Sequence, residues 1–362
     1  MYKKTAFLVC AMAALISFNN AYAGTTTPHA DQGLFEVKSA DGNYRLGFSA
    51  LLQPRLEYQH WKTKDSNKLN FDLNRARFGF YGNVFDPALT FLFQAQFEHD
   101  AERKSGLRPK ELGYASLTDF SINYAFSQEF FHIAAGKFTV PFARQQVMSP
   151  ARYQFANALS TNRYFAIAPE EDNIRDIGVM FHNGWNNPLE YALAIVQHGV
   201  GARLGYNYNN IDGYDAVDLK GGDFRFGVGV SGYLHRSKID KNGNLKGDLL
   251  SKDFNHINAS ADFIIKAHGF ATNGVFYYNW EKSKEATMGA GLDLGYLMGS
   301  FEPVLRYGWY KPVGEQRHEI MGGLNYYAFG HNLKTQLYGG VYLDAQKELN
   351  PIIAGLQLQF AL

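Results

Sequence analysis

The stretch from Tyr44 to Tyr58, YRLGFSALLQPRLEY, decides the fold class because its residues alternate between two kinds. The even positions are apolar and begin and end with tyrosine, whereas the odd positions are small, polar or charged, with Leu51 as the exception. Side chains of a β-strand point alternately to opposite faces, so this pattern predicts a strand with one apolar face. The run is also much longer than the average soluble strand of about 5–6 residues.

The same alternation recurs along the chain up to its last residues. Further runs are 75–84, 89–98, 224–231, 256–265, 287–296, 333–343 and 353–360. We count about 15 such runs, and because single-chain bacterial barrels have even strand numbers, we expect about 16 strands. The missing strand is expected either near Arg203–Tyr208 or in a split of Glu111–Phe126.

The ends of these runs favour a membrane barrel over the alternative, a soluble β-sandwich. The apolar face ends in Tyr, Trp or Phe, as expected where strands cross the lipid headgroups. Every backbone N–H and C=O must be paired in lipid, and only a closed sheet leaves no edge. We therefore predict an all-β fold, with residues 43–362 forming one transmembrane antiparallel β-barrel domain.

The first residues indicate export. Lys3 and Lys4 precede an apolar stretch from Thr5 to Phe18, and Ala21-Tyr22-Ala23 fits a small-x-small cleavage site. This pattern predicts a signal peptide over residues 1–23, with a lipoprotein cut at Cys10 as the alternative. Residues 24–42 show no periodicity and are expected to be a loose mature N-terminus. An exported barrel belongs in a Gram-negative outer membrane.

Composition excludes several functions. The chain has 35 Lys+Arg against 34 Asp+Glu, so it lacks the basic excess of a nucleic-acid-binding protein. Its single Cys rules out a disulfide scaffold. The 11 His show no metal-ligand spacing, and neither a P-loop nor a Gly-x-Ser-x-Gly motif is present. We predict no cofactor, no metal and no catalytic residue.

One long segment, residues 139–175, does not alternate. It contains Pro141, Pro150 and Pro169 together with several aromatic residues and arginines. Connections of this length are usually functional, and in a barrel they project outward or fold into the lumen. The mixture of aromatic and basic residues suits a constriction inside the pore.

Charged positions on the polar phase are the candidate pore residues. Arg75 and Arg77 share one face, and a charge facing the bilayer midplane costs about 2–4 kcal/mol, so both are expected in the lumen. They would either attract anions or only balance nearby carboxylates. The same phase argument applies to Arg45 and Arg55, which can also pair with Glu57. The further basic candidates are Lys137, which falls on the outer phase unless its strand has ended, and Arg144, Arg152 and Arg163.

The loop arginines also have two possible roles. They could line the constriction, or they could form salt bridges that hold the loop down, with Glu170, Glu171 or Asp172 as partners. The lumen phase itself is mixed in charge, since it also carries Glu57, Glu98, Asp119, Asp262, Asp293 and Glu302. Rings of fixed charge set selectivity, so phosphate specificity does not follow from the pattern.

Four short motifs resemble the phosphate-selective porin O/P family. They are Asn74–Gly82 with its Arg-x-Arg, Glu111–Ala115, Ala135–Phe142 and Arg175–Val179, within a similarity that runs from about 43 to 197. The resemblance implies a 16-stranded trimeric outer-membrane barrel, an inward third loop with Lys137 at its entry, and basic lumen side chains that select anions. Residues 354–360 also resemble the barrel assembly signal, although Ala361 and Leu362 displace the terminal aromatic residue.

These observations predict a porin, a water-filled channel for passive diffusion of small hydrophilic solutes, with anion or phosphate preference as the narrower version. The expected partners are outer-membrane lipid and lipopolysaccharide, small anions or other hydrophilic solutes, and two further copies in a homotrimer. Two alternatives remain open. One is a barrel whose loops, such as Gly199–Gly222, bind a partner, and the other is a barrel hydrolase.

Overall fold

The structure, a computed structural model, describes residues 33, 35–61, 65–98, 114–165, 175–235, 238–239, 245–246, 256–282, 284–312, 316–344 and 351–362. The expected signal peptide lies outside these residues. So do Glu111 to Gly113 and the acidic residues Glu170, Glu171 and Asp172.

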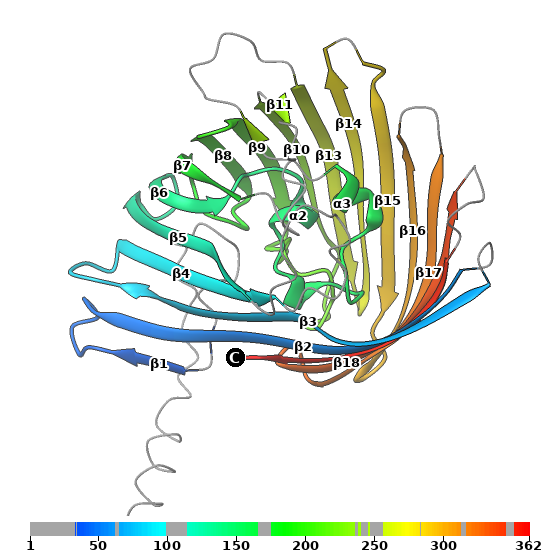
Figure 1. Cartoon of the computed structure of the whole chain (residues 1–362). Coiled ribbons are helices and arrows are strands. Elements are labelled where there is room, and N and C mark those ends of the chain that lie inside the picture. The colour runs from blue at the N-terminus through cyan, green and yellow to red at the C-terminus, as the bar shows by residue number, and fades with distance from the viewer. Residues whose placement is uncertain are drawn as a thin grey trace, which may run out of the picture.

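Sixteen antiparallel strands of the described chain close into one barrel, as predicted (Figure 1). Each strand pairs with its neighbours in sequence, and the last pairs with the first barrel strand through partners such as Leu356 and Leu56. The strands are β2 (Arg45–Trp61), β3 (Ser66–Asn83), β4 (Leu89–Glu98), β5 (Tyr114–Ser127), β6 (Phe131–Thr139), β7 (Arg175–His182), β8 (Leu189–Val196), β9 (Gly199–Tyr208), β10 (Arg225–His235), β13 (His256–Ala267), β14 (Phe270–Glu281), β15 (Thr287–Tyr296), β16 (Phe301–Lys311), β17 (Arg317–Phe329), β18 (Leu333–Asp344) and β19 (Pro351–Ala361).

The two phases of the alternation form the two faces of the barrel. Outer side chains such as Leu46, Phe71 and Phe120 are exposed, while inner ones such as Arg75 and Asp262 are buried. The outer residues would face lipid, where apolar side chains are favourable. The inner wall is polar, as the sequence predicts.

Two strand predictions are resolved by the register. Residues 203–208 belong to β9, which pairs with both β8 and β10, so the first location for the missing strand is confirmed. β5 is a single strand from Tyr114 to Ser127, and the alternative split of residues 111–126 is wrong over the part that the structure describes.

The segment expected to be loose contains one more strand. β1 (Phe35–Lys38) pairs with the first residues of β2, with Phe35 opposite Phe48 and Lys38 opposite Arg45. Its four residues are too few for the periodicity to show in the sequence. A separate two-stranded sheet joins β11 (Lys238–Ile239) and β12 (Leu245–Lys246). Among the described residues, no helix is both long enough and apolar enough to cross a membrane.

Successive connections alternate between the two ends of the barrel. At the end where β19 finishes, which we call the short-turn end, the connections are brief turns such as 128–130, 268–269 and 330–332. One connection there is longer, and we call residues 209–224 the inward turn. At the opposite, long-loop end, β6 and β7 are joined by residues 140–174, the third loop, which is described up to Phe165.

The inward turn corrects one expectation. Residues 199–222 do not form a long surface loop, because 199–208 are strand β9. The remainder starts from the short-turn end, and its residues Ile211, Tyr214 and Val217 are buried. The segment that supported the alternative of a partner-binding loop is therefore not a surface loop.

Candidate functional site

The third loop folds into the barrel. Figure 1 shows its two short helices, α2 (Arg144–Val147) and α3 (Ser160–Tyr164), inside the ring of strands. Between them, Pro150 begins a 3-10 helix (Pro150–Arg152), and the Ser149 hydroxyl accepts a hydrogen bond from the N–H of Ala151 at 3.4 Å. Ser and Pro at these positions are typical helix-start residues. The predicted inward-folding loop is thus confirmed for its described part.

An apolar cluster fixes the beginning of the loop. Phe138 is the last residue but one of β6, and Val140 and Phe142 come just after the strand. All three side chains are fully buried in the lumen. The ring of Phe142 stacks on Tyr277 of β14 with centroids 6.1 Å apart. Burial of aromatic and aliphatic side chains contributes roughly 1.5–3 kcal/mol each. The turn into the barrel therefore rests on packing as well as on polar contacts.

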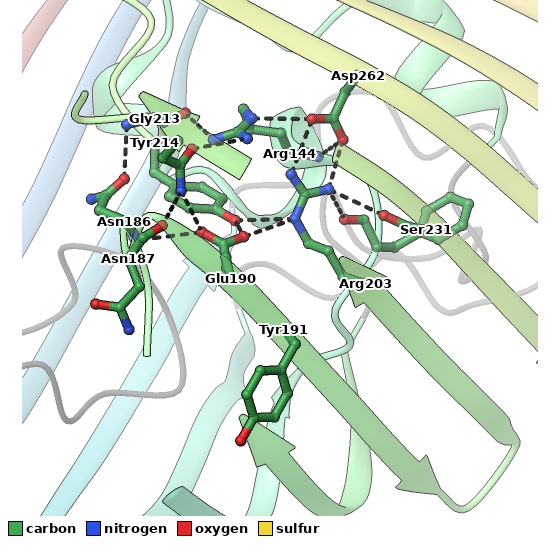
Figure 2. Close-up of polar contacts among 12 residues, drawn as sticks. Arg144, Asn186, Asn187, Glu190, Tyr191, Arg203, Gly213, Tyr214, Ser231 and Asp262 are labelled. Atoms are coloured by element: carbon green, nitrogen blue, oxygen red, sulfur yellow. Dashed lines mark hydrogen bonds and ion pairs between the residues drawn. The ribbon is translucent and has the colours of Figure 1, made fainter. Parts of the chain in front are cut away.

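Arg144 is the first polar anchor of the loop (Figure 2). Its Nε lies 3.0 Å from Oδ1 of Asp262 on β13, and its backbone N–H donates to Oδ2 at 3.0 Å. Arg203 of β9 binds the same carboxylate, with Nη1 2.6 Å from Oδ2, and it also pairs with Glu190 at 3.0 Å. All four side chains are almost completely buried. Such charges are stable inside a protein only when they are paired.

Tyr214 joins this network from the inward turn. Its hydroxyl donates to Glu190, and its ring lies 5.1 Å from the guanidinium of Arg144 (Figure 2). Burial raises the pKa of the Tyr214 hydroxyl above its usual value, so it remains a donor at neutral pH. The network therefore joins the wall, the third loop and the inward turn.

A β-bulge on β3 supplies the second anchor. The register shifts where Gln53 faces Arg75 and Pro54 faces Leu73, which leaves Asn74 as the extra residue. Asn74 and Arg75 both bind the carbonyl oxygen of Ala156 in the third loop, at 3.3 Å and 2.9 Å. A bulge changes the phase of a strand, so two consecutive polar residues can reach the same loop.

The third anchor holds the end of the loop near α3. The N–H of Ser160 donates to Oε2 of Glu319 at 2.7 Å. Arg306 of β16 pairs with Asp293 at 2.7 Å and with Glu319 at 3.4 Å, and it donates to the carbonyl oxygen of Asn157 at 2.9 Å. The loop is thus anchored to the inner wall on β3, β13, β16 and β17.

Small residues on β15 make room for this part of the loop. A Cβ placed on Gly291 would lie 2.7 Å from a methyl carbon of Leu159, and one on Gly289 would lie 2.6 Å from the Phe165 ring. Both distances are too short for real carbon atoms. The glycines of the lumen phase are therefore a docking surface for the loop.

Most of the predicted basic residues take part in polar contacts. Arg55 pairs with Asp72 at 2.7 Å and with Glu57 at 3.4 Å, which confirms the expected Glu57 contact. Arg77 donates to Gln96, and Arg75 donates to Gln53 at 3.0 Å. Arg45 does not reach Glu57, which lies far along the same extended strand, and it binds Glu36 of β1 at 2.8 Å.

The loop arginines differ from one another. Arg144 and Arg152 bind Asp262 and Asp215, so their carboxylate partners come from the wall and the inward turn. Glu170, Glu171 and Asp172, the expected partners, lie outside the described residues. Arg163 is exposed on α3. These placements do not assign a transport role, and the pore-lining role of the predicted basic residues remains a prediction.

Lys137 lies on the outer phase of β6, because that strand continues to Thr139. It is half-buried, and its Nζ donates to the carbonyl oxygen of Leu117 on β5 at 2.6 Å. Its neighbours on the same phase are apolar. The geometry therefore places Lys137 on the wall beside the loop entry rather than among the lumen side chains.

Among the buried basic residues of the lumen that sequence reasoning missed are Arg203, Arg306 and Lys334. The Lys334 ammonium donates to the carbonyl oxygens of Ala151 and Tyr153 in the third loop, at 2.9 Å and 2.8 Å. All three residues fall on the polar phase of their strands. Extending the phase argument to every strand would have found them.

Comparison with protein-family models and with curated proteins finds no match. Comparison with solved structures finds outer-membrane channels. OmpF of Salmonella typhi in complex with daunomycin is similar with a TM-score of 0.59 and 15% identity, over 90% of this chain and 100% of that chain. The outer membrane channel DcaP of Acinetobacter baumannii is similar with a TM-score of 0.58 and 11% identity, over 90% and 99%.

An anion-selective porin from Comamonas acidovorans is also similar, with a TM-score of 0.56 and 12% identity over 88% of this chain and 99% of that chain. Identities this low concern the fold alone. The chain therefore has the fold of outer-membrane porins, a closed barrel of 16 antiparallel strands.

Proposed function

We propose that this protein is an outer-membrane porin through which small hydrophilic solutes diffuse passively. The observation that carries the proposal is the third loop, which lies inside a closed 16-strand barrel and is anchored to the polar wall. Such a loop narrows a water-filled lumen without closing the barrel wall. Short turns face the periplasm in bacterial barrels, so the short-turn end would be periplasmic.

The charge of the third loop supports a preference for anions. Residues 140–165 include three arginines and no Asp or Glu. Arg144 and Arg152 have carboxylate partners, whereas Arg163 is exposed on α3. A fixed positive charge at a constriction attracts anions and repels cations. This arrangement supports a channel role.

The narrower parts of the proposal rest on the resemblance to the phosphate-selective porin O/P family. They are phosphate as a preferred solute, assembly as a homotrimer, contact with lipopolysaccharide, and export by a signal peptide over residues 1–23. The similarity to an anion-selective porin supports anion preference. The outward-facing apolar side chains support contact with lipid.

Planar-bilayer recording of the purified protein tests this proposal. We expect stepwise ion conductance and, in a salt gradient, a reversal potential on the anion-selective side. Arg163→Gln should shift the reversal potential toward cations, and so should Arg75→Ala combined with Arg77→Ala. A folded protein that produces no conducting steps would overturn the porin function. Conducting steps with cation selectivity would overturn only the anion preference.

A further inference from the structure

The inward turn enters the lumen from the end opposite the third loop. Its residues Tyr214, Ala216 and Asp218 are almost completely buried, which is unusual for a connection between two strands. Buried loops are stable only if their backbone groups are paired. The partners found here belong largely to the third loop and to neighbouring turns.

Two hydrogen bonds to backbone groups of the inward turn join it to the third loop. The N–H of Ala216 donates to the carbonyl oxygen of Arg152 at 3.2 Å. Arg144 donates from Nη1 to the carbonyl oxygen of Gly213 at 3.2 Å. Ala216 also packs with Met148 and Tyr153 of the third loop. The two segments therefore meet in the lumen although they start from opposite ends.

Their charges are complementary. The inward turn has four Asp and one Lys, whereas residues 140–165 have three Arg and no acid. Asp215 is the acid that faces the third loop, with Oδ2 3.2 Å from Nη1 of Arg152. It also binds Nε2 of His331 at 3.0 Å. Asp218, in contrast, pairs with Arg225 at 2.6 Å and accepts from the N–H of Gly269, at the short-turn end.

The exposure of the two partners differs. The Arg152 side chain is 22% exposed and the Asp215 side chain 8%. Burial opposes ionisation of Asp215, but attraction to His331, Lys266 and Arg152 holds the pKa of its carboxyl well below the usual range. The carboxylate is therefore charged at neutral pH and partly cancels the field of the more accessible arginine.

We propose that the inward turn is a second constriction element of the pore, and that Asp215 sets ion selectivity by binding and neutralising Arg152. This inference rests on the proposed porin function. In the native protein the pair contributes little net charge to the passage. Removal of the carboxylate alone would leave the positive charge of Arg152, the more exposed partner, without the compensation that Asp215 provides.

Reversal potentials of four variants test the proposal. Asp215→Asn should raise the anion-to-cation permeability ratio about twofold or more, because the Arg152 charge loses the compensation that Asp215 provides. Arg152→Gln should lower the ratio, because the Asp215 carboxylate then loses the arginine charge that balances it. The double variant with Asp215→Asn and Arg152→Gln should have a ratio close to the native one, because it removes both charges of the pair. Asp218→Asn is the matched control, because it removes an acid of the same turn that pairs away from the third loop.

Three results would overturn the role of Asp215. They are an unchanged ratio in Asp215→Asn, an equal shift in Asp218→Asn, and a double variant that keeps the full shift of Asp215→Asn relative to the native protein. Heat modifiability on gels checks that each variant is a folded barrel. If Asp215→Asn does not fold, an unchanged ratio in Arg152→Gln would still contradict the neutral pair. Absence of conductance in the native protein would instead overturn the porin function itself.

Discussion

Arg144 binds the carboxylate of Asp262 twice, once through its own backbone N–H and once through Nε, each at 3.0 Å. A single carboxylate on β13 thus fixes both the main chain and the side chain at the start of α2. Because Arg203 also binds Asp262, this carboxylate has two guanidinium partners. Its loss would leave both of them without their shared partner.

Asp262→Ala should therefore be strongly destabilising. Removing one member of a buried charge network typically costs about 3–5 kcal/mol, because the remaining charges stay buried. The free energy of unfolding in urea, followed by tryptophan fluorescence, measures the effect. Asp223→Ala is a suitable control, because Asp223 is exposed in the inward turn. Similar stabilities of the two variants would contradict the anchoring role of Asp262.

The bulge at Asn74 predicts that a deletion and a substitution have different effects. Deletion of Asn74 removes the extra residue, so that Leu73 and Arg75 follow one another in regular pairing with Pro54 and Gln53 and the bulge is lost. We expect this chain to form a barrel whose third loop is less firmly held than in the substitution variant. Asn74→Ala retains the backbone and loses hydrogen bonds to Ala156 and Gln357, at about 0.5–1.5 kcal/mol each. The free energies of unfolding in urea compare the two, and equal values would show that the bulge contributes nothing beyond the Asn74 side chain.

Gly291→Ala tests the docking surface on β15. The added Cβ would contact Leu159 at 2.7 Å, and overpacking of this kind costs about 1–3 kcal/mol. Gly232→Ala is the control, since its Cβ would have only one neighbour, at 4.0 Å. Leu159→Ala should partly restore stability in the Gly291→Ala background. A Gly291→Ala protein as stable in urea as the control would show that α3 can move away at no cost.

His198 predicts a pH dependence of stability. It lies between β8 and β9, and a hydrogen bond to Asp176 at 3.0 Å raises the pKa of its imidazole above the usual 6.5, against the effect of burial. A raised pKa in the folded state stabilises the protein most below the unfolded-state pKa. This contribution should be lost as pH rises through the folded-state pKa. His198→Gln should reduce the difference in unfolding midpoint between pH 5.5 and pH 8, whereas an unchanged difference would assign it to other groups.

Alternation predicted the barrel because one period decides the direction of every side chain in a strand. It placed Arg75, Glu57 and Asp262 in the lumen, where the structure has them. It could not choose partners, since Arg144 and Asp262 are 118 residues apart and meet only through the closed register of the barrel. The third loop could be recognised by its length, but its anchors depend on that closure.

The inward turn was missed for a different reason. Its sequence, with four Asp, two neighbouring Gly and two Asn, is typical of a solvated surface loop. Each buried acid is acceptable only because a cation from another element lies beside it, as Arg152 lies beside Asp215. Local composition does not reveal such partners. In the sequence, the polar phase of the neighbouring strands was the one indication that partners for these acids lie in the lumen.

The contacts of the third loop also constrain the order of assembly. The Asn74 amide donates to Gln357 across 283 positions of sequence, and Gln359 of β19 donates to the carbonyl oxygen of Ala151. Because β2 lies between β3 and β19, the barrel must therefore be closed before the middle of the loop has its full set of partners. Long-range contacts of this kind form late in folding. The third loop thus bridges the place where the first and last barrel strands pair, and its docking can be completed only after those strands have paired.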